Sequence, residues 1–211
     1  MAIGAKPANQ NRSIEKKERI LKALDHLLKK KSFEQISIAE VAARAKVSPA
    51  TIYQRFNNRD ALLAILIELY FRRVQEWAEA NQDNSEILTA DNVRQALITL
   101  GRNSWRQAEA LEYLLKPAYL YSRLRPDLLG PTWQQLEQRA FSGFKQFLSK
   151  FENEFSGQDI DRCANGVAYF YNLMLVGRLL HRDSGSVVLK SENDFANSLA
   201  DFALGYLKGH G

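Results

Sequence analysis

The stretch that decides the fold is residues 37–56, SIAEVAARAKVSPATIYQRF. Ser37 and Glu40 have the spacing of a capping box, which predicts that a helix begins directly after Ser37. Ser48 is a second N-cap residue, and Pro49 follows it at the first helical position, where a missing N–H costs nothing. Two helix starts so close together leave room only for a short turn. The stretch therefore predicts a helix-turn-helix.

The second helix of this motif has an apolar inner side and a polar outer side. Ile52 and Phe56 lie four residues apart and are expected to be buried. Glutamine can pair with adenine and arginine with guanine, so the outer side has the chemistry to read base edges in a major groove. The residues left on that outer side and at the helix start are Ala50, Thr51, Gln54 and Arg55.

These residues closely resemble the DNA-binding domain of the TetR family of transcriptional regulators, over roughly residues 13–65. The matching elements are Arg19-Ile20-Leu21, Phe33, Ser37-Ile38, Val41-Ala42, Val47-Ser48, Thr51-Ile52-Tyr53-Gln54-Arg55-Phe56 and Asn58-Arg59-Asp60-Ala61-Leu62-Leu63. Three positions depart from the family pattern. Ser32 and Lys46 stand where the family usually has glycine, and Arg59 stands in place of the usual lysine. Lys46 therefore either bears backbone strain or makes a slightly different turn.

The resemblance implies roles for single residues. The hydroxyls of Thr51 and Tyr53 and the side chain of Arg59 would contact DNA phosphates. Ser37 and Ser48 are either further phosphate contacts at helix starts or helix caps only. The complete set of expected DNA-binding residues is Ser37, Ser48, Pro49, Ala50, Thr51, Tyr53, Gln54, Arg55 and Arg59.

Charge supports a nucleic-acid partner for the same part of the chain. The protein has 211 residues and a net charge of +5. Residues 1–60 carry 13 Lys and Arg against 6 Asp and Glu, and residues 61–211 carry 16 against 18. No apolar run is long enough for a membrane span, no signal-peptide core is present, and Cys163 is the only cysteine. We expect a cytoplasmic protein without a membrane partner.

Helical periodicity continues to the end of the chain, and no alternating strand pattern interrupts it. The sequence predicts an all-α protein of about nine helices: 13–30, two in the motif, then 59–80, 91–107, 110–124 with Pro117 inside, 131–154, 159–182 and 191–207. We expect three parts. Residues 1–12 form a disordered basic arm, residues 13–58 a three-helix DNA-binding domain, and residues 59–211 a larger helical domain for effector binding and dimerisation.

The last two helices combine small residues with wide apolar faces. In the family, such a pair forms a four-helix bundle with its copy from a second chain, so the resemblance implies a homodimer. Ordinary packing within one chain is the alternative. The expected interface residues are Gly166, Phe170, Leu173, Gly177, Phe195, Leu199, Phe202 and Tyr206.

Large aromatic residues in the middle helices predict a cavity for a small effector, apolar or aromatic, although such residues can also be plain core. The candidates are Trp105, Tyr113, Tyr119, Trp133, Phe144 and Tyr169. The three histidines have no metal-ligand spacing, and no phosphate-binding loop or nucleophile elbow occurs. We therefore expect no metal, no cofactor and no enzyme activity.

The sequence as a whole predicts a ligand-responsive transcriptional regulator that binds double-stranded DNA. We expect a repressor that an effector releases from a palindromic operator. A transcriptional activator, or a helical module that binds protein through the same motif, is the alternative.

Overall fold

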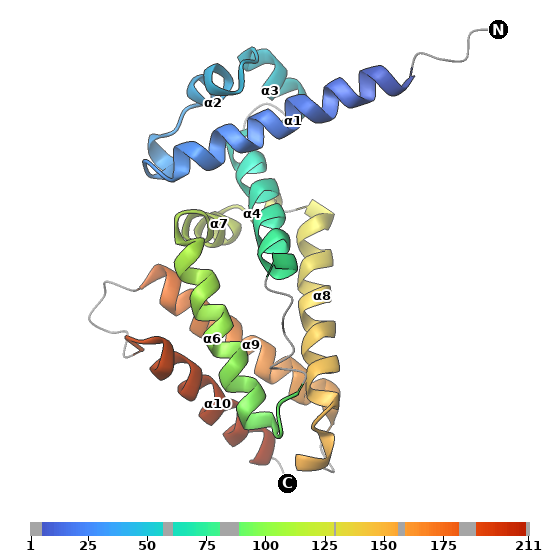
Figure 1. Ribbon diagram of the computed structural model, residues 1–211, viewed down its shortest axis with the longest axis vertical. Helices are drawn as coiled ribbons and strands as arrows, with labels where there is room; N and C mark the ends of the chain where they lie inside the picture. The colour runs from blue at the N-terminus through green and yellow to red at the C-terminus, as the bar shows by residue number, and fades with distance from the viewer. Residues whose placement is uncertain are drawn as a thin grey trace, which may run out of the picture. The chain divides into compact units, whose positions relative to one another are not determined.

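A computed structural model describes residues 6–56, 61–80, 89–128, 130–155, 159–181 and 189–209. Within these residues the chain forms nine α-helices and three short 3₁₀ helices and contains no strand (Figure 1), which confirms the all-α prediction. The chain divides into two compact units. The first contains residues 1–76 and 113–129, and the second contains residues 77–112 and 130–211.

The first unit holds the predicted helix-turn-helix. Its elements are α1 (Lys6–Leu28), a 3₁₀ turn (Phe33–Gln35), α2 (Ile38–Ala45), α3 (Pro49–Phe56), most of α4 (Ala61–Ala80), nearly all of α7 (Glu112–Leu124) and a 3₁₀ turn (Pro126–Leu128). Helix α1 lies across α2 and α3 (Figure 1). The apolar stripe of α1 is buried, as are Ile52 of α3, the middle of α4 and part of α7. The fully buried large side chains are Ile20, Leu21, Leu24, Ile52, Ile65, Leu66, Leu69 and Leu114.

The beginning of α1 differs from the predicted start at residue 13. The helix starts at Lys6, so residues 6–12 are helical rather than the expected disordered arm. Pro7 stands in the first turn, where a helix tolerates proline, and the alanine, glutamine and arginine that follow are compatible with a helix. Met1–Ala5 lie outside the described residues.

Helix α7 packs within the first unit although it lies far along the sequence. The ring of Tyr121 meets Phe33 edge-on, with 5.0 Å between the centroids. Tyr119 lies 6.0 Å from Tyr70 of α4, also edge-on. Compactness therefore groups α4 and α7 with the motif helices, whereas the division at residue 58 is one of expected role and stays a prediction.

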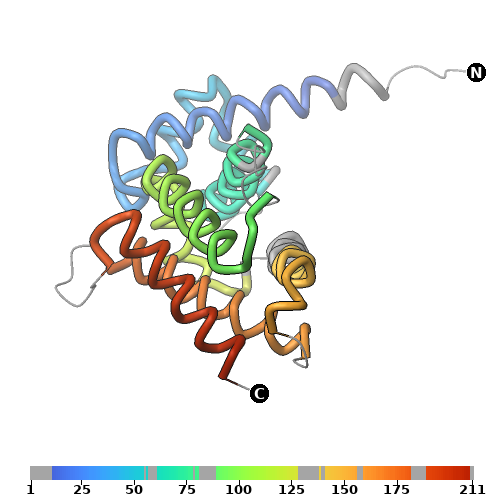
Figure 2. Tube along the Cα trace, turned by 60° about the horizontal axis from the view of Figure 1, so that its bottom comes forward, coloured from blue at the N-terminus to red at the C-terminus, as the bar shows by residue number. Residues whose placement is uncertain are grey.

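The second unit consists of α6 (Val93–Ala110), α8 (Gly130–Ser149), a 3₁₀ turn (Glu152–Glu154), α9 (Ile160–Leu180), α10 (Glu192–Lys208) and the end of α4. Helices α6 and α10 run side by side (Figure 2). A Cβ placed on Gly101 of α6 would lie 2.7 Å from the Cα of Ala196, so the absence of a side chain allows this close approach.

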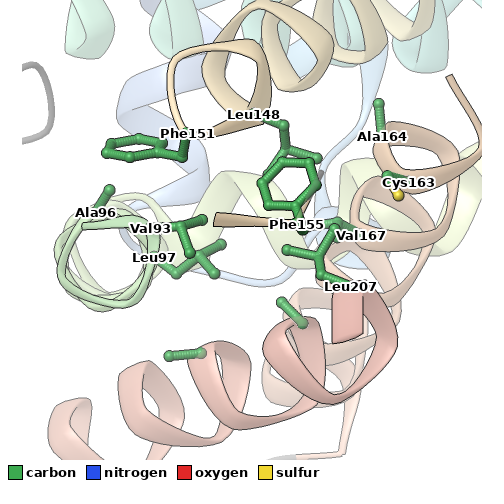
Figure 3. Close-up of a cluster of buried hydrophobic side chains, with 12 residues drawn as sticks. Val93, Ala96, Leu97, Leu148, Phe151, Phe155, Cys163, Ala164, Val167 and Leu207 are labelled. Atoms are coloured by element: carbon green, nitrogen blue, oxygen red, sulfur yellow. The ribbon is translucent and has the colours of Figure 1, made fainter. Parts of the chain in front are cut away.

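The core of the second unit is assembled from α6, α8, α9, α10 and the two residues that flank the 3₁₀ turn after α8 (Figure 3). These two residues are Phe151, at one side of the cluster, and Phe155, in its middle. The buried members are Val93, Ala96, Leu97, Leu148, Phe151, Phe155, Cys163, Ala164, Val167, Ala200, Ala203 and Leu207. Cys163 is thus a packing residue, and burial raises the pKa of its thiol.

Side-chain caps fix the starts of three helices of the second unit. Asp159 caps α9 and Ser191 caps α10. Asn92 caps α6, because its side-chain oxygen accepts from the N–H of Gln95.

Two ends differ from the prediction. Helix α6 continues to Ala110, and the chain leaves helical geometry at Leu111 (φ −114°, ψ 14°) before α7 begins. Pro117 lies inside α7, well after the break at Leu111. The helix expected over 131–154 ends at Ser149, because the chain tightens into a 3₁₀ turn that buries Phe151.

Candidate nucleic-acid interface

The start of α2 is fixed by the predicted capping box. The N–H of Glu40 donates to Ser37 Oγ (3.3 Å), and the N–H of Ser37 donates to Glu40 Oε2 (2.9 Å). Lys31 adds an ion pair to the same carboxylate. The side chain of Lys31, the backbone N–H of Ser37 and its hydroxyl together lower the pKa of Glu40 to about 2. The Glu40 carboxylate is thus paired with Lys31 and with the backbone at the start of α2.

The start of α3 is fixed in the same way. Ser48 Oγ accepts from the N–H of Thr51 (3.2 Å), and the two hydroxyl oxygens lie 3.0 Å apart. Both serines therefore act as the caps that the sequence predicts. Their hydroxyls are also exposed, so a contact with a phosphate remains compatible with capping.

The turn between the two helices answers the question raised by Lys46. Its backbone is left-handed (φ 54°, ψ 49°), the conformation for which the family usually has glycine at this position. Among the residues that the structure describes, no other non-glycine residue has a positive φ. Lys46 thus keeps the turn and bears a strain of about 1–2 kcal/mol.

Helix α3 turns its polar side outward. Ile52 is fully buried, whereas the Tyr53 ring is 40 % exposed. The other candidates on this side are exposed at Ser48, Pro49, Ala50 and Gln54 and half-buried at Thr51. The structure leaves these groups open to a partner, while their contacts with DNA stay a prediction. The side chain of Arg55 and the whole of Arg59 lie outside the described part.

Two exposed cations near the turn were missing from the predicted set. Arg44 closes α2 and Lys46 forms the turn, and both side chains face solvent. The available signal was their place beside the motif: Arg44 lies four residues after Glu40 on the outward side of α2. They add positive charge close to the start of α3, where a phosphate backbone would pass.

A buried carboxylate links three helices of the first unit. Asp25 of α1 is 6 % exposed and accepts hydrogen bonds from Arg73 of α4 (2.6 and 3.2 Å), Tyr113 of α7 (2.7 Å) and Lys29 (3.0 Å). Burial raises the pKa of Asp25, but the hydrogen bonds from Arg73, Tyr113 and Lys29 outweigh it, so the pKa lies below its usual value. Sequence patterns could not find this cluster, because its members are far apart in the chain.

The structure places the predicted effector residues in different surroundings. Tyr113 is engaged with Asp25 and Tyr119 is buried against Tyr70, both in the first unit. In the second unit Trp105 is core, Phe144 packs on Tyr171 at 5.2 Å, and Tyr169 is 69 % exposed. The side chain of Trp133 lies outside the described part. An aromatic pattern alone could not separate core from cavity.

The predicted interface residues separate into two groups. Phe195 and Leu199 are fully buried by the chain itself, against Trp105 and Met174, which corrects their assignment to a surface for a second copy. Gly166 is covered by the Tyr206 ring, which a Cβ there would meet at 2.3 Å. The remaining candidates face outward: Leu173 is 49 % and Phe202 60 % exposed, with Phe170 stacked on Phe202 and Gly177 open.

The second unit also holds a cavity of about 490 Å³ between α9 and α10. It is lined by Phe170, Met174, Gly177, Arg178, Leu189, Ser198 and Phe202. Arg178 is 2 % exposed, and its guanidinium stacks on the Trp105 ring at 4.2 Å. Its ion pairs with Glu109 (3.8 Å) and Glu112 (4.0 Å) span the break between α6 and α7. The sequence signal for this residue was a charge inside an apolar helix.

The described ranges show neither a candidate metal site nor a membrane-spanning helix. They contain no cluster of His, Cys, Asp or Glu suited to a metal ion. None of their helices is long and apolar enough to cross a membrane.

Two short helices with confirmed caps, a left-handed turn and an outward polar face define a helix-turn-helix protein with a separate helical unit. Residues 20–66 match the family model described as bacterial regulatory proteins, tetR family. The helix-turn-helix segment of the chain, residues 20–66, therefore belongs to the TetR family of regulators.

Two relatives give the extent of the similarity. A stretch of 78 residues is 31 % identical to the HTH-type dhaKLM operon transcriptional activator DhaS of Lactococcus lactis subsp. lactis (strain IL1403), covering 37 % of this chain and 38 % of that protein. The match thus spans less than half of the relative's length. The crystal structure of a putative TetR-family transcriptional regulator from Mesorhizobium loti MAFF303099 covers 94 % of this chain and 97 % of its own, with 18 % identity and a TM-score of 0.62. That likeness concerns the fold.

Proposed function

We propose that this protein is a ligand-responsive transcriptional regulator that binds a palindromic DNA operator as a homodimer. The observation that carries the proposal is α3 itself. It is held by a cap at Ser48, anchored by buried Ile52, and turns Tyr53 and Gln54 outward beside the exposed cations of the turn. A helix of this kind fits the major groove, and its surroundings supply the charge for phosphate contacts.

A selection from random duplex DNA at about 150 mM salt tests the DNA-binding role. We expect a two-fold symmetric motif with half-sites about 34–36 Å apart or a longer, helically phased distance. Recovery of no common sequence, even after unfolding and refolding to remove any bound ligand, would contradict the proposal.

Gln54 and Tyr53 separate base reading from phosphate binding. We expect Gln54→Ala to relax the preference at one base position, with about 1–3 kcal/mol of discrimination lost for a bidentate pair. Gln146→Ala on α8, exposed in the second unit, is the matched control. We expect Tyr53→Phe to weaken binding to all sequences alike and to leave the salt dependence unchanged, because a neutral hydroxyl displaces no counterion from a phosphate. A Gln54 variant with unchanged base preference would refute its role.

The dimer proposal rests on an apolar surface that the chain leaves uncovered. Tyr169, Leu173 and Phe202 are 69, 49 and 60 % exposed on α9 and α10, and Phe170 extends the patch beside Phe202 at a centroid distance of 4.7 Å. Contiguous apolar surface of this kind marks an interaction site. We expect light scattering to give roughly twice 24.1 kDa, and Phe202→Glu to give the monomer. A wild-type monomer at micromolar concentration would contradict the dimer.

Repression is the mode that we propose, by blocking transcription at the operator. Activation is a second candidate, because the relative from Lactococcus lactis is described as an activator. A reporter gene placed behind the selected operator separates the two modes by the sign of the change when the protein is deleted. If the motif binds no DNA at any salt concentration, a protein-binding module replaces both. A regulator of bacterial genes would act in the cytoplasm.

We further propose that an apolar or aromatic effector shifts the balance between conformations that fit and do not fit the operator. Coupling of this kind is reciprocal, so operator DNA must weaken effector binding by the same factor by which the effector weakens DNA binding.

A further inference from the structure

We propose that the cavity between α9 and α10 binds an apolar monocarboxylate, with the carboxylate on Arg178. This proposal rests on the ligand-responsive function above and names the site and the chemical class of the effector. The described residues that line this cavity include none of those predicted for the effector, and its volume of about 490 Å³ lies within the range of small-molecule sites.

The lining determines the chemistry of the ligand. Phe170, Met174, Leu189 and Phe202 supply apolar walls, so the body of the ligand must be apolar. Among the lining residues that the structure describes, Arg178 is the one charged group, and a ligand with one charged end and an apolar tail matches such a lining.

The charged group is Arg178, and its sign decides the charge of the ligand. A guanidinium binds a carboxylate through two parallel hydrogen bonds of about 2.7–2.9 Å, whereas a cationic head group would be repelled. The side chain is 2 % exposed, so the surrounding protein screens this attraction less than water would. Ser198, also in the lining, adds a hydroxyl that can donate to the same anion.

Among the residues that the structure describes, Glu109 and Glu112 are the anions that compete for Arg178. Their carboxylates lie 3.8 and 4.0 Å from Arg178, at the long end of an ion pair, and their side chains are 50 and 26 % exposed. Water can therefore hydrate both if a ligand draws the guanidinium toward the cavity. The expected exchange replaces two long ion pairs by one short bidentate pair.

The exchange of partners at Arg178 would act on the junction between α6 and α7. Glu109 ends α6 and Glu112 begins α7, so Arg178 bridges the break at Leu111. The next residue, Tyr113, donates to Asp25 of α1 within the first unit. Loss of the Arg178 bridge would remove one contact of the first turn of α7. The second residue of α7 is Tyr113, which is bonded to Asp25 in the first unit.

Calorimetric titration of the refolded full-length protein, without DNA, tests the binding site. The probes are decanoate, 1-decanol and decylamine, which share a tail and differ in the head group. We expect decanoate to bind, and to bind about tenfold or more tightly than the alcohol, as for a hydrogen bond to a charged group. Decylamine should bind weakest. Equal binding of all three, or no binding of decanoate, would overturn the proposal.

Two substitutions test whether the ligand binds in this cavity and on Arg178. Arg178→Met should weaken decanoate about tenfold or more and leave decanol nearly unchanged. Gly177→Leu should fill the cavity and abolish binding of both, because a Cβ at Gly177 meets nothing within 4 Å and the backbone need not move. Gly205→Leu is the matched control, since Gly205 on α10 is equally open but does not line the cavity. Unchanged decanoate binding in Arg178→Met would refute the role of the guanidinium.

The double substitution Glu109→Gln with Glu112→Gln tests the competition. Removal of the two competing charges should tighten decanoate roughly two- to fivefold, the worth of partly exposed ion pairs. Weaker binding would show that the glutamates support the site rather than compete with the ligand, and would overturn the exchange.

Light scattering on the same variants tests whether a second copy of the chain occupies the cavity. Phe170 and Phe202 belong both to the cavity and to the exposed patch. If the wild type is a dimer, Gly177→Leu is a monomer and decanoate binds neither of them, a side chain of the second copy occupies the cavity. The proposal then fails. Because no DNA is present, a failure of these titrations is distinguishable from a failure of operator binding in the DNA selection.

Discussion

Among the described residues, each of the two units buries one charged side chain, and the two are held in opposite ways. Asp25 of α1 in the first unit accepts hydrogen bonds at 2.6–3.2 Å from Arg73 of α4, Tyr113 of α7 and Lys29, which follows the end of α1. Arg178 in the second unit has an aromatic ring at 4.2 Å and carboxylates at 3.8 and 4.0 Å, and it lines a cavity.

The difference separates a charge that fixes a structure from a charge that can change its partner. Short bonds to a carboxylate on three helices fix the relative position of those helices, because each bond has a narrow range of geometry. Long ion pairs to partly exposed carboxylates impose no such geometry, and their loss can be offset by hydration. The first arrangement suits the frame of a DNA-binding motif, and the second suits a site for a ligand.

Removal of the Asp25 charge should have the largest effect. Asp25→Asn keeps the shape but leaves the guanidinium of Arg73 without its buried anion. We expect a loss of about 3 kcal/mol in the free energy of unfolding, at the low end for a broken buried pair because Arg73 is 31 % exposed. Urea unfolding at pH 7 measures it. Asp127→Asn is the control, because the Asp127 side chain is 61 % exposed and its ion pair with Arg125 is a surface pair. Equal losses in the two variants would break the comparison.

Acid should act on the first unit before the second. In the described residues, the carboxyl groups with a clearly lowered pKa are Asp25, Glu40 and Asp127, and all three lie in the first unit. A pKa that is lower in the folded than in the unfolded state stabilises the fold above the unfolded pKa, and this stability is lost as the pH falls through the folded pKa. The ordinary values are 3.8 and 4.5, and Glu40 falls to about 2, so the loss should occur between pH 4.5 and 2.

Two spectroscopic signals can follow the two units separately. The three tryptophans, at positions 77, 105 and 133, all belong to the second unit. On acidification we expect helical circular dichroism to fall before tryptophan fluorescence changes. Glu40→Gln, which retains a cap-competent side chain without a titrating charge, should flatten the early part of the circular dichroism curve. Coincident curves for the two signals would show that acid does not distinguish the units.

The predictable part of this molecule is the part whose signals are local. The caps at Ser37 and Ser48, the turn at Lys46 and the inner position of Ile52 all follow from spacings of a few residues, and the structure has each of them. The helical extension before Ser13 escaped prediction because its polar composition is equally compatible with a loop.

The second unit could be predicted as helices but not as a site. Phe195 and Phe202 lie on one helix and look alike in sequence, yet Phe195 is fully buried and Phe202 is 60 % exposed. Only the packing of α6 along α10 decides between them. Trp105 and Tyr113 likewise share the chemistry of an effector site, but their partners come from residues more than sixty positions away. Periodicity contains no information on such contacts.

The smallest effect should come from the other buried charge. Arg178→Met replaces the guanidinium by an apolar side chain that can pack on Trp105, while Glu109 and Glu112 turn to solvent. We expect a loss of only about 1 kcal/mol, close to the worth of the cation–π contact. Urea unfolding under the conditions used for Asp25→Asn makes the two values directly comparable, with Arg178→Lys as a variant that retains the charge. A loss near 3 kcal/mol would mean that Arg178 fixes the second unit as firmly as Asp25 fixes the first. Its partners would then be structural, and the guanidinium would not be available to a ligand.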